Sequence, residues 1–515
     1  MKYKISICLF LLFCFAAKSQ APNIQWKKAF GGSLNDVAYS VAQTSDGGYI
    51  IAGTTNSTQG NITVSHGNDD LWIVKTDGSG NLQWQKSFGG TGSEQARSVI
   101  TTADGGYIVA GFTSSNNGHV TYNQGSNDYW VIKLDSTGNL QWQKTYGGGG
   151  NDMANSICQT SDGGYIIAGF SNSSSGDITN PKGNNDYWIV KTDALGNLVW
   201  QKSLGGDNHD KATEIKQTKD GGYIVAGDST SSIGDPSTPT FGFSDFWIVK
   251  ISTTGNIIWE KRYGGSQNDF AHSVKPTTDD GFIVAGYTFS VNGHISGSIG
   301  PSDAWLLKLD QSGNLQWEKS LGGQTYDAAR SVIQTSDGGY LIAGDSASTN
   351  GIPSGNNGTI DFYVVKLSST GNVMWHKCLG GDNTDFGMQI IQTSDGGAVI
   401  VGETNTFNNG QVTGSFGGKD FWVVKLESVL STEETPAKNK ISVYPNPTKD
   451  FIHIENLPNN STVTMTDISG RKIFSENYSD AKISVEVSQY QKGIYILQAE
   501  HEGKEILTHK IIVSK

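Results

Sequence analysis

The chain has 515 residues, of which 66 are Gly, and charged residues make up 17% of it against a usual ~25%. Its formal net charge of −12 argues against a general nucleic-acid binder or a protein that binds anionic membranes. With 20 Phe, 19 Tyr and 13 Trp the chain has ample material for a core, which excludes disorder and favours an all-β protein.

The N-terminus has the pattern of a secretory signal peptide over residues 1–19. Lys2 and Lys4 precede an apolar run at 5–17, and Ala17-Lys18-Ser19 is a small-x-small cleavage site. The apolar run is too short for a membrane-spanning helix, and no later segment reaches 18 apolar residues. We therefore expect a mature chain that begins at Gln20 and has no transmembrane helix.

The cysteines predict neither a disulfide framework nor a metal site. Cys8 and Cys14 leave with the signal peptide, and the bulky Phe13 argues against a lipoprotein signal at Cys14. Cys158 and Cys378 remain, and they lie at different positions of the repeat described next. We expect both to be small buried apolar side chains.

Seven copies of one repeat follow the signal peptide. A tryptophan recurs every 58 or 59 residues, at Trp26, Trp84, Trp142, Trp200, Trp259, Trp317 and Trp375. Each repeat holds four short runs rich in Val, Ile, Tyr and Trp, separated by Gly, Asn and Asp, which is typical of strands and tight turns. In the first repeat these runs are Ala38–Thr44, Tyr49–Thr55, Asp70–Asp77 and Asn81–Phe88.

Seven repeats of four strands predict a seven-bladed β-propeller over residues 20–427. The seventh repeat stops at Glu427 without its Asn-x-x-Trp strand, and Asn23–Lys28 is a separate copy of that strand. We therefore expect the N-terminal strand to complete the last blade and close the ring. The alternative, an open solenoid, would need distinct polar caps at both ends.

The fourth strand of each repeat resembles the tryptophan-docking motif of quinoprotein-like propellers. Asp135–Trp142 fits that pattern, and Asp310–Trp317 fits with one change. Other copies depart from it, because Ser252 and Ser368 replace the Asp and Leu195 replaces the Thr. The motif packs one blade on the next in that family, so the resemblance implies a fold and no activity. Seven repeats, where that family generally has eight, weaken a dehydrogenase interpretation.

Residues 428–440 are polar and predict a linker, and residues 441–515 form a module of different character. Alternating apolar residues, as in Phe451–Ile454, predict a small immunoglobulin-like β-sandwich. The module resembles the type A C-terminal sorting domain of the type IX secretion system. The residues that carry this resemblance are Tyr444, Pro445, Asn446, Pro447, Gly493, Tyr495 and Lys510.

The resemblance implies a cellular location and binding partners. It implies a Gram-negative bacterium, export to the periplasm, and recognition by the type IX translocon and its sortase. The protein is then either secreted or attached to the outer-membrane surface. Beyond that machinery, we expect an extracellular glycan or a surface protein as partner, and no nucleic acid.

Two rings of acidic residues are predicted at the end of the propeller that carries its long loops. One is Asp36, Glu94, Asp152, Asp210, Asp269, Asp327 and Asp385, and the other is Asp70, Asp128, Asp186, Asp245, Asp303, Asp361 and Asp420. Their presence in every blade favours a structural role in turns. Asp207 with Asp210 and Asp382 with Asp385 are candidate Ca²⁺ ligands, because there the acidic residue is doubled. We expect no other cofactor.

Features confined to single blades carry the hypotheses about function. Aromatic side chains in the long loops, which could stack on sugars, are Tyr122, His119, Phe241, Phe243, Phe289 and His294. Asp228, Asp345 and Glu403 share one repeat position; we expect solvated or turn-capping carboxylates rather than a catalytic pair. The sequence therefore predicts a non-catalytic binding or adhesion module with no catalytic residue. The alternative is a secreted endoglucanase-like glycoside hydrolase.

Overall fold

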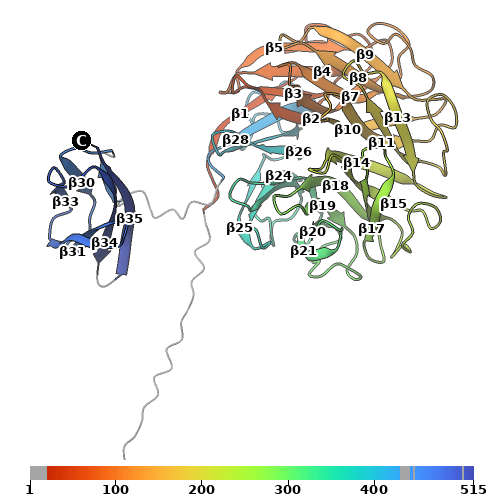
Figure 1. Cartoon of the computed structure of the whole chain (residues 1–515). Coiled ribbons are helices and arrows are strands. Elements are labelled where there is room, and N and C mark those ends of the chain that lie inside the picture. The colour runs from red at the N-terminus through yellow and green to blue at the C-terminus, as the bar shows by residue number, and fades with distance from the viewer. Residues whose placement is uncertain (1–19, 430–440, 445–446, 502–503, 515) are drawn as a thin grey trace, which may run out of the picture. The chain divides into compact units, whose positions relative to one another are not determined.

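The computed structural model describes residues 20–429, 441–444, 447–501 and 504–514. The regular secondary structure of these residues consists of strands alone (Figure 1). The all-β prediction is confirmed. The described residues fall into two compact units that divide between residues 430 and 431. Within the described ranges, no helix is long and apolar enough to cross a membrane. The predicted signal peptide and most of the predicted linker lie outside the described residues.

The first unit contains seven four-stranded antiparallel sheets, which we number in chain order. Sheets 1 to 3 are β2 (Asp36–Gln43), β3 (Tyr49–Thr55), β4 (Asp70–Thr76) and β5 (Leu82–Phe88); β6 (Glu94–Thr101), β7 (Tyr107–Thr113), β8 (Asp128–Leu134) and β9 (Leu140–Tyr146); and β10 (Asp152–Gln159), β11 (Tyr165–Ser171), β12 (Asp186–Thr192) and β13 (Leu198–Leu204). Sheets 4 to 6 are β14 (Asp210–Gln217), β15 (Tyr223–Ser229), β16 (Asp245–Ile251) and β17 (Ile257–Tyr263); β18 (Asp269–Pro276), β19 (Phe282–Thr288), β20 (Asp303–Leu309) and β21 (Leu315–Leu321); and β22 (Asp327–Gln334), β23 (Tyr340–Ser346), β24 (Asp361–Leu367) and β25 (Val373–Leu379).

Sheet 7 joins the two ends of the repeat region. It contains β26 (Asp385–Gln392), β27 (Ala398–Thr404), β28 (Asp420–Leu426) and, as its fourth strand, β1 (Ile24–Phe30). Strand β1 runs antiparallel to β28, with Ile24 opposite Leu426 and Phe30 opposite Phe421. The first strand of the unit therefore supplies the pairing that the last repeat lacks.

The seven sheets are arranged around a common centre, with the first strand of each sheet innermost (Figure 1). Each first strand contacts the first strands of both neighbouring sheets, and β2 of sheet 1 contacts β26 of sheet 7. One hydrophobic cluster is shared by these two sheets and includes Val41 and Val401. This arrangement is consistent with a β-propeller.

An ion pair between a buried lysine and an aspartate of the turn supports the turn between the first two strands of every sheet. In sheet 1 the turn needs Gly47 at a φ of 80°, and the buried Lys75 contacts Asp46 at 2.9 Å. Burial alone would raise the pKa of Asp46, but hydrogen bonds from Thr44 and Lys75 lower it to about 2. The equivalent pairs are Lys133–Asp104, Lys191–Asp162, Lys250–Asp220, Lys308–Asp279, Lys366–Asp337 and Lys425–Asp395.

Glycines allow each sheet to approach the next. A Cβ added to Gly138 would lie 2.7 Å from the ring of Trp84 in the preceding sheet, and one added to Gly80 would lie 2.7 Å from the ring of Trp26. Trp26 also donates a hydrogen bond from Nε1 to the Gly78 carbonyl at 3.1 Å. Trp26 on β1 therefore docks on sheet 1 as Trp84 docks on sheet 2.

The second unit consists of two sheets around one core. The three-stranded sheet holds β29 (Ser442–Tyr444), β30 (Phe451–Glu455) and β33 (Lys482–Glu486), and the four-stranded sheet holds β31 (Ser461–Asp467), β32 (Lys472–Tyr478), β34 (Gly493–His501) and β35 (Lys504–Val513). Ile454, Val463 and Leu497 belong to the core that both sheets bury. Strand β32 was not predicted, and the immunoglobulin-like topology stays a prediction.

The packed part of the first unit extends beyond residue 427. Val429 is fully buried in the core of sheet 7 and donates its N–H to the Gly396 carbonyl at 2.9 Å. Val429, which the sequence assigned to the linker, therefore packs against the sheet.

Replacing Trp26 by Ala tests the docking of β1. Because the Trp26 ring is half-buried, we expect the variant to lose about 1–3 kcal/mol of unfolding free energy, below the usual range for fully buried aromatics. Urea unfolding of the mature chain measures the loss, with Trp84→Ala as the matched variant within a continuous repeat. A loss at Trp84 with none at Trp26 would contradict the equivalence of the two contacts.

Candidate functional site

A β-bulge interrupts the first strand of every sheet and places one extra residue there. In sheet 5 the register shifts between Ala271 and Ser273, so His272 is the extra residue. Bulges commonly re-aim a side chain near functional sites. The seven bulge residues are Tyr39, Arg97, Asn155, Thr213, His272, Arg330 and Met388. They vary from sheet to sheet, although the residues on either side repeat.

Two neighbouring bulge residues, His272 and Arg330, belong to one polar group. Arg330 donates from Nε to Asp345 Oδ1 at 2.8 Å and from Nη2 to the Tyr326 hydroxyl at 2.9 Å. Its Nη1 lies 3.1 Å from His272 Nε2. Three donors of one guanidinium are thus used on three side chains from sheets 5 and 6, which fixes the Arg330 side chain.

Aromatic rings surround Tyr287, at the end of β19. Its ring stacks on His272 with centroids 5.4 Å apart, and lies 5.3 Å from Phe270 and 5.7 Å from Phe289. The Arg330 guanidinium lies 5.6 Å from the Tyr287 centroid. Phe289 is 39% exposed, so this aromatic group reaches the surface. We call Phe270, His272, Tyr287, Phe289, Tyr326, Arg330 and Asp345 the His272 cluster.

The cluster combines a neutral histidine with a buried ion pair. Burial and the nearby Arg330 charge lower the pKa of His272 well below its usual value. Because neutral His272 accepts at Nε2, its proton is on Nδ1. Asp345 is fully buried, and burial raises the pKa of its carboxyl group. The Arg330 charge and hydrogen bonds with Arg330 and the Tyr326 hydroxyl oppose that shift.

The three carboxylates at the shared repeat position lie on β15, β23 and β27, in three different sheets. Asp345 is near enough to Glu403 that its charge helps to raise the pKa of Glu403, after the larger effect of burial. Asp345 and Glu403 are buried and form ion pairs with Arg330 and Lys419, so the prediction that they are solvated or cap turns was wrong. Burial raises the pKa of Asp228 to about 7, although Lys211 and Ser244 oppose the shift.

The other bulge residues make different contacts from one another. Arg97 lies over the Tyr39 ring at 4.3 Å and near Phe112 at 5.7 Å, which forms a second, smaller cation–aromatic group. Asn155 and Thr213 instead bond to backbone carbonyls of the neighbouring sheets. Sequence reasoning missed His272, Arg330 and Tyr326. The signal was there: one variable position inside an otherwise repetitive strand.

The loops of sheets 4 and 5 bring two of the predicted aromatic residues together. Phe241 lies edge-on to His294 with ring centroids 4.7 Å apart, and His294 also packs on Tyr263 at 5.3 Å. The Gly264 N–H donates to His294 Nδ1 at 3.3 Å, so this histidine anchors its loop. Phe243 is 65% exposed and Phe241 47%, which leaves both rings accessible.

The predicted residues of sheet 2 divide in the same way. His119 accepts the Gly89 N–H at 3.2 Å and packs edge-on to His66 at 4.7 Å, so it also holds a loop in place. Tyr122 is 60% exposed. The aromatic candidates therefore comprise anchoring histidines and free rings, and no contact joins sheet 2's candidates to those of sheets 4 and 5 among the interactions of the described residues.

The candidate Ca²⁺ ligands have hydrogen-bond partners within the fold. Asp210 and Asp385 are fully buried and accept the N–H groups of Gly206 and Gly381. Asp207 accepts the Ser232 N–H at 2.8 Å, and Asp382 accepts the Asn409 amide at 2.6 Å. The described part of the chain holds no group of three His, Cys, Asp or Glu side chains placed to bind a metal ion.

The two acidic rings meet where neighbouring sheets join. A Cβ on Gly31 would lie 2.0 Å from Asp420 Oδ1 and 2.7 Å from Asp36 Oδ2, so only glycine fits between the two carboxyl groups. Asp420 accepts the Phe416 N–H at 2.7 Å, while its Oδ1 is buried without a hydrogen-bond partner in the described structure. Burial, followed by repulsion from Asp36, raises the pKa of Asp420 to about 7.

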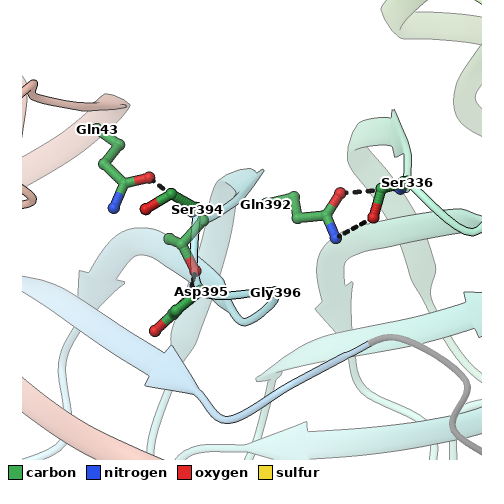
Figure 2. Close-up of a pocket in the computed structure, with 7 residues that line it drawn as sticks. Gln43, Ser336, Gln392, Ser394, Asp395 and Gly396 are labelled. Atoms are coloured by element: carbon green, nitrogen blue, oxygen red, sulfur yellow. Dashed lines mark hydrogen bonds between the residues drawn. The ribbon is translucent and has the colours of Figure 1, made fainter. Parts of the chain in front are cut away.

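A shallow hollow of about 660 Å³ lies at the opposite end of the sheets, among the Asp-Gly-Gly turns (Figure 2). Gln43 accepts the Ser394 N–H at 2.9 Å, and Gln392 accepts the Ser336 N–H at 3.0 Å. The same link from a glutamine to the preceding turn recurs at Gln159, Gln217 and Gln334. The hollow is therefore lined by scaffold contacts.

The described residues of the predicted sorting motif lie on the strands of the second unit or beside them. Tyr444 is exposed on β29 and donates to Glu455 Oε1 at 2.6 Å, and Pro447 is exposed. Gly493 begins β34, Tyr495 is buried in the core, and Lys510 is exposed on β35. Pro445 and Asn446 lie outside the described residues.

Comparison with known families confirms the nature of this unit. Residues 442–514 match the family described as "Secretion system C-terminal sorting domain". The protein is therefore secreted or displayed on the surface of a Gram-negative bacterium, and its C-terminal unit interacts with the type IX secretion machinery.

Curated relatives of the repeat region are distant. The regulatory protein FlaEY of Caulobacter vibrioides is 25% identical over 390 residues, and the uncharacterized WD repeat-containing protein L264 of Acanthamoeba polyphaga mimivirus is 23% identical over 282 residues. The alignments cover 64% and 44% of this chain. The chain spans only 38% and 20% of the lengths of these relatives.

Two solved structures are similar at low TM-scores. PorZ, a surface component of the type IX secretion system of Porphyromonas gingivalis, is 11% identical with a TM-score of 0.38, over 94% of this chain and 60% of PorZ. A puromycin hydrolase is 11% identical with a TM-score of 0.45, over 82% of this chain and 59% of the hydrolase. We draw nothing about activity from either.

The acidic junctions predict how stability depends on pH. Burial raises the pKa of Asp420 to about 7 and those of Asp36, Asp128, Asp186, Asp245 and Asp361 to about 6. The folded chain then holds protons that the unfolded chain releases between about pH 4 and 7, so stability falls as pH rises through that window.

Asp420→Asn should weaken this dependence, because the amide is uncharged beside Asp36. We expect a higher Tm than wild type at pH 8 and a smaller gain at pH 5, measured by thermal unfolding. Asp480→Asn removes the same charge from an exposed site in the other unit and serves as control. An equal effect of Asp420→Asn at both pH values would contradict the assignment.

Proposed function

We propose that residues 20–427 form a closed seven-bladed β-propeller, preceded by a signal peptide at 1–19 and joined through a linker at 428–440 to the sorting domain at 441–515. The pairing of β1 with β28 and the contact of β2 with β26 support ring closure. The docking of Trp26 on Gly80 supports a likeness to tryptophan-docking propellers.

We further propose that the propeller binds a saccharide of an extracellular glycan at the His272 cluster and does not turn it over. The partly exposed ring of Phe289 beside Tyr287, in a cluster whose Arg330 side chain is fixed by three contacts, carries this proposal. Aromatic rings suit the apolar face of a sugar. The exposed rings of Phe241, Phe243 and Phe289 would extend the contact along a longer chain.

Hydrolysis is the second candidate function, and the geometry supports it less. A glycosidase needs two carboxyl groups that flank one bond, about 5–10 Å apart. Of the three candidates, Asp345 and Glu403 are held in ion pairs with Arg330 and Lys419. Asp228, with a pKa of about 7, is the one carboxyl of the three suited to act as an acid.

Binding is tested with the mature chain, residues 20–515, on a glycan array and by titration calorimetry. Phe289→Ala removes a 39% exposed ring, so we expect at least ~5-fold weaker binding with an unchanged Tm. Phe416→Ala is the matched control, since this ring is 43% exposed in the loop before β28. Equal effects of the two substitutions would argue against the His272 cluster.

Reducing-end release is followed in the same samples. We expect none above background. Steady release that Asp228→Asn abolishes would replace the binding proposal with the hydrolase.

Removal of the C-terminal unit tests whether this unit directs the protein to the cell surface. A chain that ends at residue 440 keeps β1 to β28 and should fold, but it should accumulate in the periplasm because it lacks residues 442–514. Cell fractionation and surface labelling measure its location. Normal surface display of the truncated chain would contradict this expectation.

A further inference from the structure

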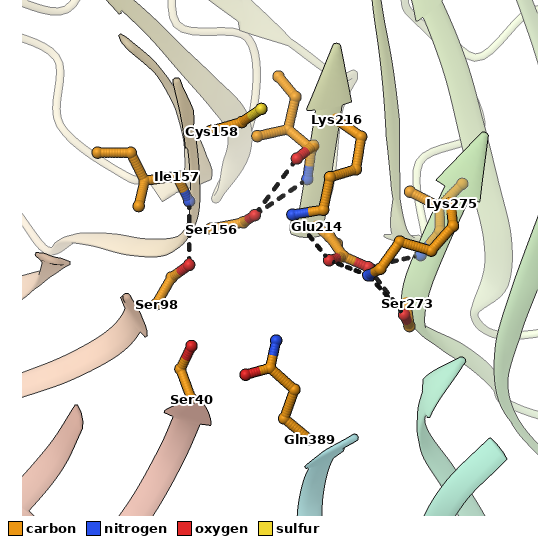
Figure 3. A network of polar contacts seen from close by, with 12 residues as sticks. Ser40, Ser98, Ser156, Ile157, Cys158, Glu214, Lys216, Ser273, Lys275 and Gln389 are labelled. Atoms are coloured by element: carbon orange, nitrogen blue, oxygen red, sulfur yellow. Dashed lines mark hydrogen bonds and ion pairs between the residues drawn. The ribbon is translucent and has the colours of Figure 1, made fainter. Parts of the chain in front are cut away.

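A belt of hydrogen bonds links the first strands of neighbouring sheets. The Val99 N–H of sheet 2 donates to Ser40 Oγ of sheet 1 at 3.0 Å. In the same way, the Ile157 N–H of sheet 3 donates to Ser98 Oγ of sheet 2 at 3.3 Å (Figure 3). Serine occupies this position in five sheets, at Ser40, Ser98, Ser156, Ser273 and Ser331, whereas Glu214 and Gln389 replace it in the other two. Serine is thus sufficient for the belt, and a glutamate adds a charge.

Glu214 makes the belt contact with one carboxylate oxygen. Its Oε2 accepts the Val274 N–H and the Ser273 hydroxyl, each at 2.8 Å. Its Oε1 is shared by Lys216 Nζ at 3.0 Å and by Lys275 Nζ (Figure 3). Both ammonium groups therefore crowd against one oxygen, on the inner strands of sheets 4 and 5.

This group carries one more positive than negative charge. Lys216 and Lys275 each lie two residues after the belt residue of their strand, toward the Asp-Gly-Gly turns. At this position the other five sheets have Ala42, Ile100, Cys158, Ile333 and Ile391, so no carboxylate occurs there. Burial, with the nearby Lys216 charge, lowers the pKa of Lys275 to about 8, which is the expected cost of a second ammonium in this place.

The surplus charge is accessible. The Lys216 and Lys275 side chains are 23% and 20% exposed, and Lys275 also lines a hollow of about 400 Å³ with Thr277 and Gln334 among others. One lysine would neutralise Glu214, so neutralisation does not explain the second. Each ammonium has three donors; Glu214 takes one from each, and Lys275 gives a second to Ser273 Oγ at 3.3 Å.

We propose that Lys216 and Lys275 bind an oxyanion, a phosphate or carboxylate group, at the Asp-Gly-Gly end of the inner strands. This site is distinct from the His272 cluster, although one strand, β18, carries both His272 and Lys275. An oxyanion bridging the two ammonium groups would offset the surplus charge and relieve their repulsion.

Titration calorimetry of the mature chain with inorganic phosphate, and separately with glucuronate, tests the site and distinguishes the two sources of oxyanion. We expect binding of at least one of them, weakened at least ~10-fold by Lys275→Met and retained by Lys275→Arg. Lys472→Met, which removes an exposed lysine of the second unit, is the control. No binding of either probe, or equal binding by Lys275→Met, would overturn the proposal.

Cys158 provides a second measurement that does not depend on affinity. It is a free, partly exposed thiol close enough to influence the pKa values of Lys216 and Lys275, while Cys378 is buried. If the lysines attract anions, the labelling rate with iodoacetate relative to iodoacetamide should fall at least ~3-fold in Lys275→Met. An unchanged ratio would show that the lysine pair does not attract anions.

Discussion

The structure of residues 24–426 depends on how closely one four-stranded sheet can approach the next. Large rings on one sheet rest on glycines of its neighbour: Trp84 on Gly138, and Phe421 on Gly53, where a Cβ would lie 2.7 Å from the ring. Van der Waals attraction falls off steeply with separation, so a single methyl group at such a contact would push the sheets apart. The serine belt and the glycine between two carboxyl groups require the same close spacing.

This packing also separates scaffold from function. Residues that hold the sheets together repeat in most sheets, as the belt serine does in five of the seven, since the junctions impose similar geometry. The bulge on each inner strand is free of that constraint, because its extra residue has no partner in the ladder. His272 and Arg330 occupy two such positions, and the lysine pair occupies another level of the same strands. Chemistry is thus carried by positions that the packing leaves free to vary.

Much of this fold could be predicted from the sequence, because the same strand and turn motifs recur every 58 or 59 residues. The strand Tyr49–Thr55 was placed to the residue and the other three strands of that repeat to within two residues at each end. The separate copy of the fourth strand at Asn23–Lys28 indicated the partner of β28. The candidate site could not be predicted in the same way. The variable position on the first strand was visible in the sequence, but nothing indicated that Arg330 would contact both His272 and Asp345. The loop histidines were misleading for the opposite reason: an exposed loop suggests a free ring, but His119 and His294 accept backbone N–H groups.

The pairing of β1 with β28 has a consequence for the order of events during synthesis. Strand β1 is made first, yet its partner is complete only when residue 426 has been added. Until then β1 has no edge to join, and contacts between residues so far apart in sequence form slowly. The sorting domain begins at residue 442, beyond the end of β28 at Leu426, so it is synthesised only after every strand of the first unit. A chain that stops before residue 426 therefore lacks both the complete partner of β1 and the segment that directs passage through the type IX machinery.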